Sequence, residues 1–146
     1  TVLNCIIWNC PQPITLADSS NTEIEDRGSH ITVSYSDIQG GQAGVSVSGS
    51  ESIVAWGQDN FDADPLFADP LHGDFHLRSQ FGRYDPGTRT WVRDDRTSPC
   101  IDAGDPDDPV GDEPEPHGSR INLGAHGGTP EASKSPGVVV SPGTAQ

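Results

Sequence analysis

The acidic residues of this chain have a type and spacing that could support catalysis or metal binding. Asp62 and Asp64 lie two residues apart, so in an extended segment both carboxylates project from the same face. Hydrolysis of a glycosidic bond needs two carboxylates roughly 5–10 Å apart across a sugar cleft. Both residues precede Pro65, however, and aspartates in turns commonly accept hydrogen bonds from backbone N–H groups. We therefore assign no catalytic residue, and whether the chain is an enzyme stays open.

Calcium is the ligand that the acidic stretches favour. Ca²⁺ takes about six to eight oxygen ligands, which Asp side chains and loop carbonyls can supply. One oxygen-rich stretch contains Asp59, Asn60, Asp62 and Asp64; a second contains Asp102, Asp105, Asp107 and Asp108. Neither has the spacing of an EF-hand or of a Gly-rich nonapeptide repeat, so a solvated acidic loop is the alternative. The first stretch is the predicted Ca²⁺ site.

A second candidate metal site lies in the segment His72 to Leu77. His72, Asp74 and His76 alternate, and two imidazoles with a carboxylate can hold a transition metal. The alternation of Asp74-Phe75-His76-Leu77 is equally explained by an edge strand with one buried face.

Exposed aromatic residues offer a carbohydrate platform. Tyr84 and Trp91 flank a segment that reads as an exposed excursion, and aromatic faces can stack on sugar rings. The alternative is packing of this loop onto the rest of the chain. Trp8 and Trp56 lie in strand-like segments, and we expect both to be buried.

The three cysteines form an odd set. Cys10 or Cys5 could pair with Cys100 in an oxidising compartment, and we predict Cys10–Cys100 as the disulfide. A cysteine can equally serve as a small buried hydrophobe.

The charge of the chain excludes two classes of partner. With 22 acidic and 8 basic residues the formal net charge is −14, so no basic patch can gain counterion-release energy from nucleic acid. No apolar run approaches the roughly 18 residues that a membrane span needs. An acidic surface suits cation binding and solubility outside the cell.

An internal repeat predicts the fold. The segment beginning at Thr1 matches the segment beginning at Thr32, which aligns Val2 with Val33, and the same offset aligns Ile14-Thr15-Leu16 with Val45-Ser46-Val47. A period of about 20–50 residues is typical of solenoids, and the segments are strand-like. We therefore expect an all-β fold, a short parallel β-helix in which Val2 stacks over Val33 and Ile14 over Val45.

Three segments follow from this interpretation. Residues 1–59 are the expected β-helix coils, residues 60–129 a loop-rich closing segment, and residues 130–146 a flexible Ser/Pro/Gly tail. Val138-Val139-Val140 in the tail could donate a strand to a neighbour. Because Thr1 falls inside a strand-like pattern, we expect a fragment whose upstream coils are missing.

Six motifs occur in one order along the chain. They are Asn4-Cys5-Ile6-Ile7-Trp8-Asn9, Ser34-Tyr35-Ser36-Asp37-Ile38-Gln39-Gly40-Gly41, Asp62-Ala63-Asp64-Pro65-Leu66-Phe67, Asp74-Phe75-His76-Leu77, Ser98-Pro99-Cys100-Ile101-Asp102-Ala103-Gly104 and Asn122-Leu123-Gly124-Ala125-His126-Gly127-Gly128. Over roughly residues 1–132 the chain resembles the C-terminal end of large secreted bacterial right-handed parallel β-helix proteins with pectate-lyase-like repeats. The resemblance implies a right-handed coil and export, and it does not indicate an enzymatic activity.

The expected function is a non-catalytic structural or assembly segment of a secreted, extracellular or cell-surface β-helix protein, which self-associates into a fibre through its open coil end. The alternative is a carbohydrate-binding or polysaccharide-degrading β-helix module, a lyase or hydrolase. The expected partners are upstream coils of the same protein or identical subunits, joined head-to-tail or by strand addition, and extracellular polysaccharide. Nucleic acid and a membrane span are not expected.

Overall fold

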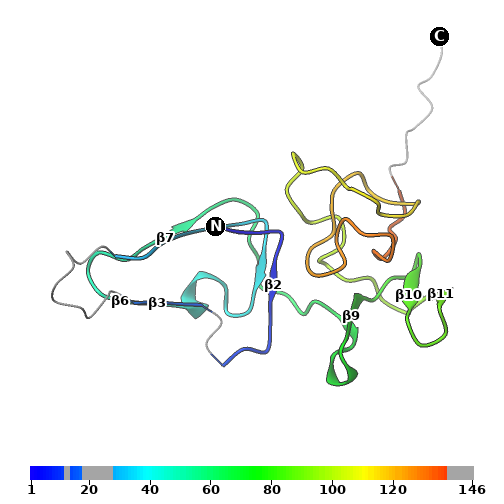
Figure 1. Cartoon of the computed structure of the whole chain (residues 1–146), viewed down its shortest axis with the longest axis horizontal. Helices are drawn as coiled ribbons and strands as arrows, with labels where there is room; N and C mark the ends of the chain where they lie inside the picture. The colour runs from blue at the N-terminus through cyan, green and yellow to red at the C-terminus, as the bar shows by residue number, and fades with distance from the viewer. Residues whose placement is uncertain (12–13, 18–27, 138–146) are drawn as a thin grey trace, which may run out of the picture.

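The computed structural model describes residues 1–11, 14–17 and 28–137 of the chain (Figure 1). Its regular elements are short strands and two single-turn 3₁₀ helices. In chain order they are β1 (Val2–Leu3), β2 (Ile6–Ile7), β3 (Ile14–Ala17), β4 (His30–Ser34), β5 (Asp37–Ile38), η1 (Gly41–Gly44), β6 (Val45–Ser48), β7 (Ile53–Trp56), β8 (Phe67–Asp69), η2 (Pro70–His72), β9 (Asp74–Leu77), β10 (Arg83–Asp85) and β11 (Thr90–Val92).

Parallel strand pairs build the N-terminal half. Strand β4 lies between β1 and β7, while β2 pairs with β5 and β3 with β6. The register places Val2 opposite Val33 and Ile14 opposite Val45, so the pairing predicted from the thirty-one-residue offset is confirmed.

The corners between these strands repeat with the same offset. Asn4 and Tyr35 both have a positive φ, of 52° and 46°, and so do Asn9 and Gly40, with 56° and 83°. A left-handed residue turns the chain sharply, and Asn and Gly tolerate that conformation best. Each bend after β1 and β2 is thus repeated after β4 and β5, which keeps the paired strands parallel and in register.

The predicted right-handed parallel β-helix with a closing segment is wrong, although the all-β class is right. In the residues that the structure describes, the strands form one three-stranded sheet and four two-stranded sheets, and none closes or continues as a solenoid. The thirty-one-residue offset relates only two turns, whereas β7 pairs with β4 at a shorter spacing, Val33 opposite Trp56. After the single bridge between Asp37 and Phe61 the chain leaves this arrangement, and two turns are too few for a solenoid.

The C-terminal half has a different construction. Its two strand pairs, β8 with β9 and β10 with β11, are antiparallel. Residues 98–137 contain no regular element and are held by side chains that bond to backbone. The amide of Asn122 accepts from Asp102 N at 2.8 Å and donates to Ser133 O at 2.7 Å, and the Glu113 carboxylate accepts from Asn122 N at 2.8 Å. The predicted segment boundaries stay predictions, and Val138-Val139-Val140 lie outside the described residues.

Each half has its own hydrophobic core, and specific bonds join the two. One core centres on Ile14, Leu16, Val33 and Ile38; the other centres on Leu77, Cys100, Ile101 and Leu123. Gly124 N donates to Asn4 O at 3.0 Å, and Asn4 Nδ2 donates to Asp108 Oδ2 at 2.7 Å. The N-terminal strands and the C-terminal loops therefore meet along the chain segment that contains Asn4.

Candidate functional site

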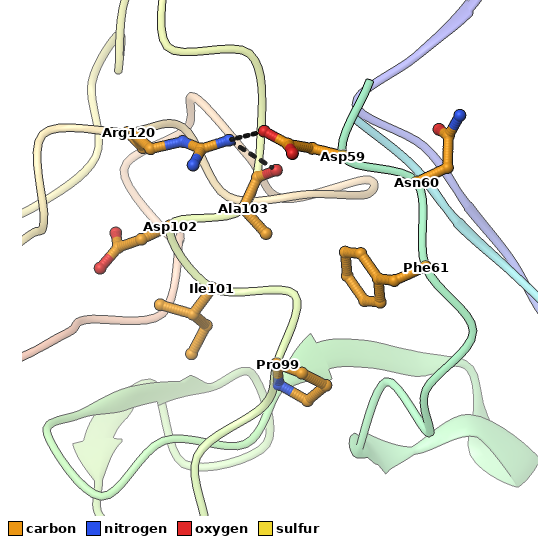
Figure 2. A pocket seen from close by; sticks show the side chains of 8 residues that line it. All are labelled: Asp59, Asn60, Phe61, Pro99, Ile101, Asp102, Ala103 and Arg120. Atoms are coloured by element: carbon orange, nitrogen blue, oxygen red, sulfur yellow. Dashed lines mark hydrogen bonds and ion pairs between the residues drawn. The ribbon is translucent and has the colours of Figure 1, made fainter. Parts of the chain in front are cut away.

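An open cleft with a volume of 410 Å³ lies where the two halves meet (Figure 2). Its walls come from the segment after β7 and from the loops of the C-terminal half. The lining residues are Asp59, Asn60, Phe61, Pro99, Ile101, Asp102, Ala103 and Arg120. Figure 2 shows the charged groups of Arg120 and Asp59 at one end and the apolar side chains of Phe61 and Ile101 below them.

The polar groups of this cleft are largely used by the protein itself. Arg120 Nε donates to Gly104 O at 2.8 Å, and Nη2 of the same side chain lies 3.8 Å from Asp59 Oδ2. Asp102 Oδ1 accepts from Gly118 N at 3.1 Å. Of these contacts, the Arg120–Asp59 pair links the two halves and the other two lie within the C-terminal half, so the polar groups of the cleft serve the fold rather than being free ligand donors.

The structure separates the four residues predicted to bind Ca²⁺. Asp59 and Asn60 line the cleft, but Asn60 Oδ1 already accepts from Ser36 N at 3.1 Å. Asp64 Oδ1 accepts from Leu66 N at 2.9 Å, as expected for an aspartate in a turn, and Asp64 lines a different pocket. Asp62 is exposed and lines none of the pockets described here. Calcium binding at these residues stays a prediction.

A groove centred on Trp8 and Phe67 has a composition better suited to a ligand. It consists of two adjoining pockets of 190 and 230 Å³ that share these two residues, and we call it the Trp8 groove. Phe75 adds an aromatic wall, with its ring edge-to-face against Phe67 at a centroid distance of 5.3 Å. The polar lining residues are Asn9, Asp64, Arg78 and Arg96.

The two arginines of the Trp8 groove differ from Arg83 and Arg120 in their lack of a carboxylate partner in the part of the chain that the structure describes. Arg83 lies 3.0 Å from an Asp94 oxygen, and Arg120 is paired with Asp59. Within the described ranges, neither Arg78 nor Arg96 forms an ion pair, and Arg78 donates only to Ala68 O at 3.3 Å. In a chain of net charge −14, this leaves two guanidinium groups free to bind an anionic group beside an aromatic surface.

The sequence did not identify Trp8 as a site residue. We expected it to be buried, whereas it is half-buried and lines both pockets of the groove. The available signal was its position: Trp8 follows the two-residue strand β2 and precedes Asn9, a residue that turns the chain. Side chains at such a strand end lie at the rim of a sheet.

The predicted carbohydrate platform, Tyr84 and Trp91, lies on the β10–β11 hairpin instead. The two rings pack edge-to-face at 5.7 Å, and Lys134 Nζ lies 4.5 Å from the centre of the Trp91 ring. Trp91 remains 41% exposed. Packing therefore uses part of both rings, and sugar stacking here stays a prediction.

The histidines of the second predicted metal site are distributed differently from the expected alternation. His72 lies in η2, with an exposed side chain whose Nδ1 is 2.7 Å from Asp69 Oδ2. His76 is buried, and its Nδ1 is hydrogen-bonded to Asp74 Oδ1 at 2.6 Å. Its other neighbours, His126 and Glu131, come from a turn fifty residues later, which no local spacing indicated.

The electrostatic setting of this cluster favours a neutral imidazole. Burial, and after it the neighbouring His76, lowers the pKa of His126 below its ordinary value of 6.5. The ring of His126 is therefore unprotonated near neutral pH, with one nitrogen lone pair available.

All three cysteine thiols are free, so the predicted Cys10–Cys100 disulfide is not present. Cys10 is exposed, whereas Cys100 is fully buried and its Sγ lies 3.1 Å from Asp37 Oδ2. Burial raises the pKa of the Cys100 thiol, and burial also raises the pKa of Asp37. Cys100 is thus a core residue that donates a hydrogen bond to a buried carboxyl group.

The fold and these sites define a small all-β protein with an aromatic groove and a histidine cluster. A family model described as disaggregatase related matches residues 15–104, which is more than half of the chain. The chain belongs to this family, and the expected membership of the pectate-lyase-like β-helix proteins is wrong. No curated protein and no solved structure matches the chain. No helix among the described residues has the length and apolar character that a membrane crossing requires.

Proposed function

We propose that this chain is a non-catalytic carbohydrate-binding module of an extracellular protein. The observation that carries the proposal is the Trp8 groove, in which aromatic side chains lie beside two arginines without carboxylate partners. Ligand sites are typically apolar surfaces with a few well-placed polar groups, which is the composition of this groove.

The chemistry of the groove points to a sugar that carries a carboxylate. The ring of Trp8 offers a flat apolar face for a pyranose, while Asn9 supplies an amide for hydroxyl groups. A guanidinium group binds a carboxylate through two parallel hydrogen bonds, so Arg78 and Arg96 favour a uronate over a neutral sugar. The negative charge of the whole chain opposes polyanions, but screening limits that effect to about 8 Å at physiological ionic strength.

The family description is compatible with the proposal without specifying a ligand. Its description associates the chain with disaggregatases, and binding of surface carbohydrate is compatible with a protein that breaks up aggregates. The proposal assigns recognition to this chain and no bond cleavage.

Binding of oligosaccharides by isothermal titration calorimetry tests the proposal. We expect uronate-containing oligosaccharides to bind more tightly than neutral ones of equal length. Trp8→Ala should weaken binding of both classes at least about tenfold, which corresponds to about 1.4 kcal/mol. Arg96→Gln should weaken only the uronate class.

Two controls separate this site from other surfaces. Arg93 is exposed and lies outside the groove, so Arg93→Gln should leave both affinities unchanged. Trp91→Ala tests the hairpin as the platform: loss of binding in this variant, with Trp8→Ala unaffected, would contradict the assignment to the Trp8 groove.

A second candidate function, self-association, is favoured by the outer strands of the N-terminal half. Strands β6 and β7 each end a sheet, and they expose Val47 (46%) and Ile53 (52%). An unpaired strand edge with exposed apolar side chains is a template for another chain, and we propose that a second copy of this chain adds there.

Sedimentation velocity over a range of concentrations tests self-association. We expect a concentration-dependent dimer or larger species that Ile53→Lys reduces, while Leu71→Lys, at a 92% exposed position outside these strands, leaves it unchanged. A monomer at all concentrations would exclude this second function without affecting carbohydrate binding.

A further inference from the structure

Three side chains from two distant segments converge beside β9. His76 comes from the strand, and His126 and Glu131 come from the turn that the chain forms fifty residues later. One ligand atom from each lies within 4.8 Å of the others, the only such group of three among the described residues. The His76 and His126 rings stack with centroids 3.6 Å apart, and His76 Nε2 lies 3.4 Å from Glu131 Oε2.

His76 presents an unsatisfied nitrogen to this cluster. The residue is only 3% exposed, and within the described part of the chain its Nε2 has no hydrogen-bond partner. Buried polar atoms are nearly always partnered, so an orphan nitrogen calls for a ligand that completes it. The position of this nitrogen, facing Glu131, directs that ligand into the space that the three side chains share.

The opposite nitrogen of the same ring fixes the state of Nε2. Nδ1 of His76 lies 2.6 Å from Asp74 Oδ1, and a carboxylate accepts a hydrogen bond from an imidazole N–H. This bond places a proton on Nδ1, so in the neutral ring the lone pair is on Nε2. A carboxylate on the far nitrogen is the usual second-shell partner of a histidine that binds a metal.

Asp74 is itself held in place. Nη1 of Arg83 lies 3.7 Å from Asp74 Oδ2, and Arg83 is anchored by a 3.0 Å bond from Nε to Asp94 Oδ2. A series of contacts from Asp94 through Arg83 and Asp74 thus fixes the orientation of the His76 imidazole. The exposed pair of His72 and Asp69 has no third charged partner among the residues that the structure describes.

We propose that His76, His126 and Glu131 bind a Zn²⁺ ion whose fourth coordination position is open to solvent. Imidazole nitrogen and carboxylate oxygen together suit zinc, whereas Ca²⁺ and Mg²⁺ require oxygen ligands. Three protein ligands with one free position is the arrangement of open zinc sites, and Glu131, with 48% of its side chain exposed, places that position at the surface. Binding draws the two rings out of their stack until both nitrogens reach about 2.0–2.1 Å from the ion.

The site would tie the turn of His126 and Glu131 to β9. Ser133, two residues after Glu131, already donates its hydroxyl to Leu77 O in the same strand. Zinc would therefore strengthen a connection between a strand and a loop segment that contains no regular element of its own.

Calorimetric titration of the chelator-treated full chain with ZnCl₂, at high salt to suppress binding to scattered carboxylates, tests the proposal. We expect one Zn²⁺ per chain. His126→Gln and Glu131→Gln should each lower the affinity at least about tenfold. His72→Gln is the matched control, because it removes an exposed histidine that also has an aspartate partner, and it should bind zinc as the unmodified chain does.

Cobalt provides a readout that does not depend on folding stability. Co²⁺ in the site should give the intense visible absorption of a four-coordinate ion, and His126→Gln should abolish it while its far-ultraviolet circular dichroism stays unchanged. Absence of saturable Zn²⁺ binding, or equal zinc affinity in His126→Gln and His72→Gln, would overturn the proposal and identify the cluster as a stacked histidine pair only.

Discussion

Strands β4 and β9 lie in the two halves of the molecule and are held in different ways. Strand β4 has a parallel neighbour on each side, β1 and β7, so its order comes from backbone ladders that repeat along the chain. Strand β9 pairs only with β8, and its other contacts are single bonds from distant loops, such as Ser133 Oγ to Leu77 O. Repetition orders the first half, whereas the second depends on individual side chains.

This difference decides where candidate sites occur. The repeated strands place side chains at regular positions, and Trp8 becomes available only where β2 ends at the junction with β8. The irregular half can bring together residues far apart in the chain, as it does with His76, His126 and Glu131. Both candidate sites therefore depend on the irregular half being ordered.

The largest expected effect comes from truncating one core residue in each half. Ile38 (0% exposed) and Leu123 (1% exposed) are buried in the two separate cores, and replacing either by Ala should lower the free energy of unfolding by about 2–5 kcal/mol. Because bonds such as that from Gly124 N to Asn4 O link the halves, we expect one thermal transition, shifted in both variants.

Differential scanning calorimetry distinguishes the alternatives. Two transitions, with Ile38→Ala shifting one and Leu123→Ala the other, would show that the halves unfold independently. In that case the N-terminal and C-terminal halves would be two separate folding units.

A pair of asparagines sharpens the comparison. Asn122, 2% exposed, bonds through its amide to Asp102 N and Ser133 O, while Asn60, half-buried, bonds to Ser36 N and Val33 O. Each side chain bonds to two backbone groups, and the groups on Ser36, Val33 and Ser133 belong to buried residues, so Asn122→Ala and Asn60→Ala should each cost about 1–3 kcal/mol. Urea denaturation of both variants gives the two values, and a clearly larger loss for Asn122→Ala would show that the irregular half depends more on single side chains than the repeated one.

The sequence predicted the repeated half well and the rest poorly, for a physical reason. The register of Val2 with Val33 could be predicted because strand pairing is local to a repeat and leaves a fixed offset in the sequence. The pairing of β7 with β4 could not be predicted from that offset. The loop between β6 and β7 is shorter than the loop between β3 and β4, so β7 follows β4 at a smaller distance along the sequence. His126 and Glu131 join His76 only through the path of an irregular loop, and no residue pattern encodes that path.

The candidate sites show the same limit. Asp59 and Asp64 belong to the same acidic stretch but line different pockets. The carboxylate of Asp64 accepts from Leu66 N and so stabilises a turn that separates the two residues. The alternation of His72, Asp74 and His76 predicted a shared metal ion. In the structure Asp74 bonds to His76 Nδ1, and His72 pairs with Asp69 instead.

The pH dependence of stability tests the contact between the halves at Asp37 and Cys100. Burial raises the pKa of Asp37 above its ordinary value of 3.8, so the folded chain keeps this proton after the unfolded chain has lost it. Stability should therefore fall as the pH rises from 3.8 through the raised pKa, because the folded state must then hold a buried charge. Asp37→Asn removes this contribution.

Urea denaturation at a series of pH values measures the effect. The difference in unfolding free energy between Asp37→Asn and the unmodified chain should change in favour of the variant as the pH rises above 3.8. Self-repulsion of the other carboxylates is nearly the same in both proteins, so the difference isolates Asp37. A constant difference over the whole range would mean that Asp37 titrates alike in the folded and unfolded states.

The smallest expected effect concerns the charged pair at the cleft between the halves. Arg120 and Asp59 lie 3.8 Å apart, and 63% of the Asp59 side chain is exposed, so solvent screens their attraction. Asp59→Asn should therefore change the free energy of unfolding by less than about 0.5 kcal/mol, and added salt should reduce this difference further because it screens the exposed pair. Arg120→Gln should cost more, because Arg120 also donates to the carbonyl oxygens of Ala103 and Gly104. Equal losses in the two variants would instead make the ion pair, and not the bonds to backbone, the contact that closes the cleft.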